Sequence, residues 1–83
     1  MRTIRTEAKK NCTVVICYDH LLVLDSRKTV QYSLYRSMVR DFVWAESIHA
    51  YSGCFVQGEY SNHILEKLLV INRDGKIIAE LEF

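Results

Sequence analysis

The first clear hydrophobic run in the chain is Cys12–Tyr18, which is apolar on both faces. A strand with two apolar faces is typical of a central position in a sheet. The run stops at Asp19-His20 and resumes at Leu21–Leu24. We therefore predict two strands joined by a tight hairpin at Asp19-His20. One long bent strand over residues 12–25 is the alternative interpretation.

The C-terminal third of the chain has the alternation of a second set of strands. Asn72–Gly75 separates two apolar runs, and its Asp-Gly pair favours a hairpin because glycine readily adopts the positive φ of such a turn. After it, Ile77, Ala79, Leu81 and Phe83 alternate with charged or apolar neighbours, as in a half-exposed strand. The predicted strands here are Cys54–Tyr60, Ile64–Ile71 and Ile77–Phe83.

The central segment predicts a long helix from Lys28 to Tyr51. At 100° per residue, an apolar stripe forms along one side of this helix; it consists of Val30, Leu34, Ala45 and Ile48, with Met38 at its margin. Gly53 follows at a position that suits a helix C-terminus. The alternative is a strand over Thr29–Tyr35, which is rich in strand-favouring residues. In that case Asp25–Lys28 is a hairpin turn and the helix begins near Ser37.

These elements predict an α+β fold in the order β-β-α-β-β-β, a small antiparallel sheet with one long helix packed on one face. Residues 1–11 are polar and basic and are expected to form a flexible or short helical lead-in. Residues 12–83 form a single α+β domain. A chain of 83 residues has room for one domain only.

Composition and charge exclude several classes of protein. The chain is 49% hydrophobic and 25% charged, which is typical of a globular domain and not of a disordered one. Its apolar runs are too short to span a membrane as a helix. An odd number of cysteines, three, does not fit a fully paired disulfide framework, so we expect a cytoplasmic protein with free thiols.

The predicted helix carries more apolar surface than one sheet covers, because a second patch lies about half a turn from the first. Exposed apolar patches of this kind commonly mark interfaces. The sequence thus predicts a small binding or regulatory module that acts through protein contacts, with a homodimer as the simplest partner. The predicted partner-binding residues are Tyr32, Tyr35, Val39, Phe42 and Val43.

A nucleic-acid-binding protein is the alternative function. It would use Arg36 and Arg40, one helical turn apart, together with Lys9 and Lys10 of the basic N-terminal segment. The formal net charge of +1 argues against a strong field toward a polyanion.

No motif points to a catalytic, cofactor or metal site. Cys12, Cys17 and His20 have the spacing C-x4-C-x2-H, which lacks the close pairs of structural zinc sites. Cys12 and Cys17 would also face opposite sides of a strand, because their separation is odd. The three glycines are isolated, so there is no phosphate-binding loop. We therefore expect buried free thiols and no enzyme activity.

Overall fold

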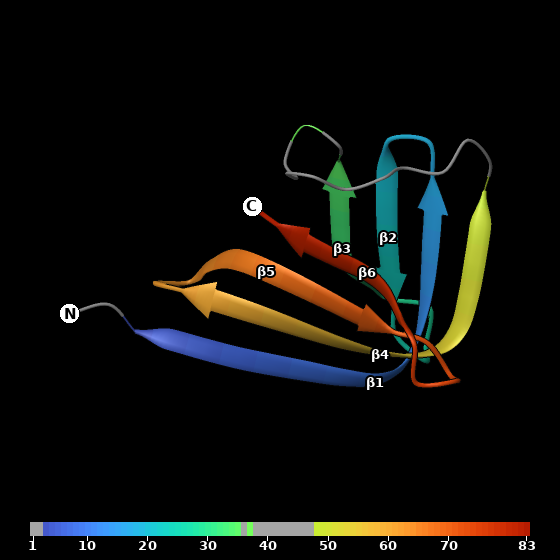
Figure 1. Cartoon of the computed structure of the whole chain (residues 1–83), viewed down its shortest axis with the longest axis horizontal. Helices are drawn as coiled ribbons and strands as arrows, with labels where there is room; N and C mark the ends of the chain where they lie inside the picture. Colours follow the sequence, from blue (N-terminus) through green and yellow to red (C-terminus); the bar gives the residue numbers. More distant parts are fainter. Residues whose placement is uncertain (1–2, 36, 38–47) are drawn as a thin grey trace.

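The computed structural model describes residues 3–35, 37 and 48–83. This part of the chain forms one sheet of six antiparallel strands in the order β3-β2-β1-β4-β5-β6 (Figure 1). The strands are β1 (Ile4–Cys17), β2 (His20–Leu24), β3 (Val30–Tyr35), β4 (His49–Ser61), β5 (Ile64–Ile71) and β6 (Ile77–Glu82). No α-helix occurs among the described residues.

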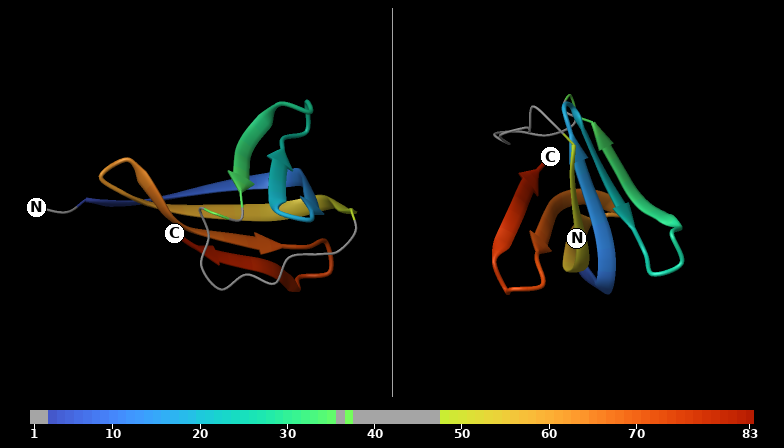
Figure 2. Two further views of the ribbon diagram at one scale, coloured as in Figure 1. Left: turned by 90° about the horizontal axis from the view of Figure 1, so that it is seen from above. Right: turned by 90° about the vertical axis from the view of Figure 1, so that its right-hand side faces the viewer.

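The sheet curls into half a barrel because its two longest strands, β1 and β4, bend near their middles. The β1–β4 register shifts between Lys9 and Cys12 and again between Cys12 and Val14. Asn11 and Gly53, on either side of this bend, have φ values of 57° and 69°. Bulges of this kind add a residue to one strand and bend it. The two arms of the sheet therefore run in different directions and partly enclose a common interior (Figures 1 and 2).

The core fills the concave side of this half barrel, called the inner face below. Alternate residues of each strand point inward, and Val14, Leu21, Val23 and Leu68 are fully buried. The rest of the buried hydrophobic set is Cys12, Ile16, Tyr32, Leu34, Cys54, Val56, Val70, Ala79 and Leu81. Since all strands contribute, burial of this face is what holds the curled sheet together.

The α+β class and the helix over Lys28–Tyr51 were wrong. Val30–Tyr35 is strand β3 and Tyr51 belongs to β4. The period-2 pattern prevails in β3 because Tyr32 and Leu34 lie directly opposite Val23 and Leu21 of β2, on the buried inner face. Helical winding would turn one of these side chains away from that core. The remainder of the predicted helix, residues 36 and 38–47, lies outside the described residues.

Asp25–Lys28 is the turn that joins β2 to β3, as the alternative interpretation required. The Asp25 amide donates to the Thr29 carbonyl at 2.9 Å, and the Lys28 amide donates to the Asp25 carbonyl at 3.0 Å. The Asp25 carboxylate accepts the amides of Arg27 and Thr29 at 2.8 and 2.9 Å. Asp25 therefore organises the turn with its side chain and does not start a helix.

The N-terminal segment also differs from the prediction. Residues 4–11 are the first part of β1 and not a lead-in. They pair with β4 in an unbroken register from Ile4 opposite Ser61 to Lys9 opposite Val56. Nothing within residues 1–11 provides that partner, which lies some fifty positions further along the chain. The segment becomes a strand because β4 supplies the hydrogen bonds.

The predicted hairpins are present, with small shifts of position. The β1–β2 turn is centred on Tyr18-Asp19, one residue before the predicted Asp19-His20. Asn62-His63 joins β4 to β5, and both residues have positive φ, as a type I′ turn requires. Gly75, at the β5–β6 turn, has a φ of 80°, which confirms the prediction from Asp-Gly.

Candidate functional site

The most unusual feature of the sheet is a long unpaired edge on the first half of β1. Residues 4–9 pair with β4 on one side. β2 covers the other side of β1 only from Thr13 to Cys17. No described strand therefore runs beside residues 4–11 on the side away from β4, as the blue part of β1 illustrates in Figure 1. This side of residues 4–11 is called the β1 edge.

The direction of the main-chain groups along the β1 edge follows from one hydrogen bond. The Asn62 amide donates to the Thr3 carbonyl at 3.1 Å, so Thr3 directs its carbonyl toward the β4–β5 hairpin. In an antiparallel ladder the hydrogen-bonding groups of successive residues point to alternate sides. Ile4, Thr6 and Ala8 therefore direct their amide and carbonyl groups away from β4. Among the strands that the structure describes, none pairs with the donors and acceptors that the β1 edge thus presents at three alternate residues.

The side chains of this segment divide between the two faces of the sheet. Arg5, Glu7 and Lys9 lie on the inner face, because each is directly opposite an inner-face residue of β4. Ile4, Thr6 and Ala8 lie on the outer face and are exposed, with Ile4 62% exposed. The inner row is therefore charged in the order plus, minus, plus, whereas Ile4, Thr6 and Ala8 of the outer row carry no charge.

Arg5 is held in place by an aromatic ring. Its guanidinium carbon lies 4.8 Å from the centre of the Tyr60 ring. Tyr60 is opposite Arg5 on β4, so a cation–π contact joins the two strands at this point. The contact fixes the first charge of the row relative to the sheet.

Glu7 lies near the polar end of the core. Its partner on β4 is Gly58, and the Tyr32 hydroxyl approaches this glycine so closely that an added Cβ would be 2.9 Å from it. The Tyr60 hydroxyl donates to the Tyr32 hydroxyl at 3.1 Å. Burial raises the pKa of Tyr32 above its ordinary value, and the negative charge of Glu7 acts in the same direction.

A small hollow lies at the start of the β1 edge. It is lined by Thr3, Arg5, Tyr60, Asn62 and His63, and its volume is about 170 Å³. Pockets for drug-sized ligands occupy roughly 300 Å³ or more. The hollow is therefore suited to a side chain of an approaching polypeptide and not to a larger cofactor.

Tyr32 and Tyr35, which the sequence predicts as partner-binding residues, lie on different faces of β3. Tyr32 is only 8% exposed and belongs to the core, whereas Tyr35 is 52% exposed. The Tyr35 ring stacks on His20 of β2, with 4.5 Å between the ring centres and 3° between their planes. Val39, Phe42 and Val43 lie outside the described residues. The two tyrosines therefore do not form one surface.

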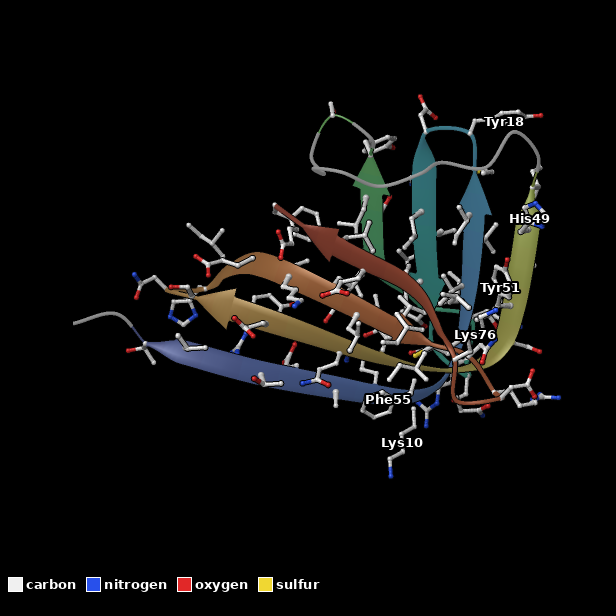
Figure 3. The ribbon with its side chains drawn as sticks, in the orientation of Figure 1. Lys10, Tyr18, His49, Tyr51, Phe55 and Lys76 are labelled. Carbon is white, nitrogen blue, oxygen red and sulfur yellow. The ribbon has the colours of Figure 1, made fainter. Side chains whose placement is uncertain are left out.

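The candidate nucleic-acid residues are likewise divided. Lys9 is on the inner face and half-buried, and Lys10 is exposed on the other side of the same strand. Figure 3 shows Lys10 extending away from the sheet. Arg36 and Arg40 lie outside the described residues. Binding to nucleic acid stays a prediction.

Two of the three free cysteines face each other in the core. Cys12 on β1 is directly opposite Cys54 on β4, and both are fully buried. Burial raises the pKa of each thiol, which makes Cys54 a poor nucleophile. Cys17 is half-buried on the outer face, as the odd spacing predicted. Among the residues that the structure describes, no cluster of His, Cys, Asp or Glu could hold a metal ion.

Comparison with protein families, with curated proteins and with solved structures found no match. Within the described ranges, no helix has the length and hydrophobicity needed to cross a membrane. The fold therefore defines only a class, that of small all-β proteins built on a curled antiparallel sheet.

Sequence reasoning missed the β1 edge because residues 1–11 contain few hydrophobic residues. The signal that was present is the alternation of Arg5, Glu7 and Lys9 with Thr6 and Ala8. A period of two in charge is as strand-like as a period of two in hydrophobicity.

Proposed function

We propose that this protein is a small binding module that acts through protein contacts, and that it binds extended segments of polypeptide by adding them as a strand to the β1 edge. The observation that carries the proposal is the row of outward main-chain groups at Ile4, Thr6 and Ala8. An exposed sheet edge of this kind is a template for another strand.

The charges beside the edge give the proposed site a specificity. A strand added to β1 would place its alternate side chains opposite Arg5, Glu7 and Lys9 on the inner face and opposite the uncharged row on the outer face. The preferred ligand would thus carry charges of the order minus, plus, minus at alternate positions. Because β4 already orders residues 4–9, little conformational entropy is lost by the edge on binding.

The proposal is tested by selecting displayed random peptides on the folded protein and measuring their binding to proline variants. Thr6→Pro removes an outward amide, and it leaves the β1–β4 ladder intact because that amide does not point to β4. Proline is tolerated in edge strands for this reason. We expect selected peptides to have extended sequences with alternating charge and to lose binding to Thr6→Pro.

The matched control is Glu7→Pro, which removes an amide that points to β4. This variant should lower the thermal stability, whereas Thr6→Pro should lower peptide binding at nearly unchanged stability. If Thr6→Pro does not fold, Ala8→Pro takes its place in the test, because Ala8→Pro removes the next outward amide. Peptides that bind these edge variants and the parent protein equally well would overturn the proposal.

We place the protein in the cytoplasm as part of the same proposal. What supports this location is that all three cysteines are free although Cys12 and Cys54 are directly opposite one another. Opposed residues in an antiparallel pair have Cα atoms about 4.5–5.5 Å apart, which is within disulfide range. Expression in a reducing and in an oxidising compartment, followed by mass determination of the alkylated protein, tests the placement. Peptide binding that requires a Cys12–Cys54 disulfide would contradict it.

A further inference from the structure

We infer that the strand added to the β1 edge is the β1 edge of a second copy of this chain, paired antiparallel about a two-fold axis that places Thr6 opposite Thr6 of the other copy. This inference rests on the proposed function, because it names the occupant of the same edge. It is carried by the order of charges along residues 4–9 and by the direction of their main-chain groups.

A symmetric antiparallel pair restricts the possible registers. Opposed residues share a face, so in one continuous sheet an inner-face residue must meet an inner-face residue. With Thr6 on the axis, Arg5 of each copy is opposite Glu7 of the other, and Ile4 is opposite Ala8. The inner face then gains two pairs of opposite charge, and the outer face gains apolar pairs and a threonine pair. Opposite-charge pairs and threonine pairs are stabilising across antiparallel strands.

The neighbouring registers are unfavourable. Moving the axis to Glu7 places Glu7 against Glu7 and Arg5 against Lys9, which are like charges. Moving it to Arg5 places Arg5 against Arg5. An axis at Ala8 restores opposite charges but requires Asn11 in the paired region, where φ is 57° and the strand register breaks. Thr6 is therefore the axis position that satisfies both charge and regular strand geometry.

The main-chain groups agree with the same axis. Ile4, Thr6 and Ala8 direct their amide and carbonyl groups away from β4, and these are the residues that would meet one another. Thr6 would exchange a pair of N–H···O=C bonds with Thr6 of the second copy, and Ile4 would do so with Ala8. No main-chain group would have to leave β4 to form this pairing.

Charged residues on an edge strand can also serve to prevent pairing. That role predicts a monomer at all concentrations, so the two cases are separated by light scattering on purified protein over a wide concentration range. If a second copy occupies the edge, we expect a dimer. Its dissociation constant should rise about tenfold with either Arg5→Glu or Glu7→Arg, because each substitution creates two pairs of like charges across the interface. Combining both substitutions restores opposite charges and should restore the dimer.

Asp19→Arg is the matched control for Glu7→Arg, since it makes the same change from a negative to a positive charge at an exposed turn outside the edge. It should leave the dissociation constant unchanged. The restored double variant also guards against a loss of folding, because Arg5→Glu alone gives up the contact with Tyr60. A double variant that is folded yet remains monomeric would overturn the charge pairing.

Cysteine trapping provides an independent test of the register. In a Cys17→Ser background, Thr6→Cys should form a disulfide between copies in a glutathione redox buffer, because opposed hydrogen-bonded residues have Cα atoms about 5.5 Å apart. Ala8→Cys should form far less, since its partner in this register is Ile4. Preferred trapping through Ala8→Cys would overturn the Thr6 axis.

These results are distinguishable from a failure of the proposed function. A protein that stays monomeric but binds selected peptides through the β1 edge overturns the second copy as the occupant and leaves strand addition standing. A dimer that persists in Thr6→Pro overturns the edge as the interface. A dimer lost in Thr6→Pro and in both charge variants, and regained in the double charge variant, supports the inference.

Discussion

The hydroxyl group of Tyr60 on β4 donates a hydrogen bond of 3.1 Å to the hydroxyl group of Tyr32 on β3. The two strands are not neighbours in the sheet, since β2 and β1 lie between them. The bond therefore joins the two arms of the half barrel across its interior. It lies over Gly58, where an added Cβ would be 2.9 Å from the Tyr32 hydroxyl and 3.3 Å from Leu65 and Tyr60.

Gly58→Ala should lower the free energy of unfolding by about 1–3 kcal/mol, the usual cost of forcing an extra carbon into a packed core. The cause is the contact with the Tyr32 hydroxyl, so the cost should be smaller in a Tyr32→Phe background. Chemical denaturation of the two single variants and the double variant measures the coupling, which we expect to exceed about 0.5 kcal/mol. Gly75→Ala is the control: nothing lies near its Cβ, so any cost of its positive φ should not depend on Tyr32.

Stability should fall at alkaline pH, in part through Tyr32. Burial and the nearby negative charge of Glu7 raise the pKa of Tyr32 above its ordinary value of 10.0. The contribution of the neutral phenol is present in full below pH 10.0. Above it, the unfolded chain releases a proton that the folded protein keeps, so stability decreases as pH rises toward the pKa of the folded state.

Cys12 and Cys54 should begin the same alkaline decrease about one pH unit earlier, because burial raises both thiol pKa values above 9.0. Urea denaturation at a series of pH values from neutral to above 10 measures the slope. Tyr32→Phe should flatten the slope above pH 10.0 and leave the part between 9.0 and 10.0 unchanged. An identical slope in both proteins would contradict the assigned burial of the Tyr32 phenol.

The three thiols should differ in their rates of alkylation. Cys12 and Cys54 are fully buried and their pKa values are raised, so they should react only as fast as the protein opens. Cys17 is partly exposed on the outer face and should react under native conditions. Peptide mapping after timed labelling separates the sites. Rapid labelling of Cys54 in the folded protein would be inconsistent with the β1–β4 packing.

Asp25→Ala should destabilise the protein by about 1–2 kcal/mol, because the carboxylate accepts the amides of Arg27 and Thr29 and a third hydrogen bond from the Gln31 side chain. Loss of these bonds loosens the connection between β2 and β3. Thermal unfolding measures the change. Asp19→Ala, at another exposed turn, should cost less than about 0.5 kcal/mol, and equal costs would argue against a special role for Asp25.

The sequence by itself determined the elements whose partners are close along the chain. The strands on either side of Asn72–Gly75 were predicted almost as they are, because the turn residues and the alternation from Ile77 onward agree locally. The second half of β1 and all of β2 except His20 were also predicted, since one short hairpin joins them. In such hairpins the hydrogen-bond partners follow within a few residues, so local pattern is sufficient.

Only the tertiary structure decided β3 and the first half of β1. Residues 30–35 fit both a helical and an alternating pattern. They form a strand because Tyr32 and Leu34 are then both buried opposite Val23 and Leu21. Residues 4–9 have little hydrophobic signal and are strand because Val56–Ser61 lies beside them. A helix satisfies its own main-chain groups, whereas a strand depends on partners that are distant in sequence. The β1 edge, and with it the candidate site, exists only where such a partner is present on one side and not on the other.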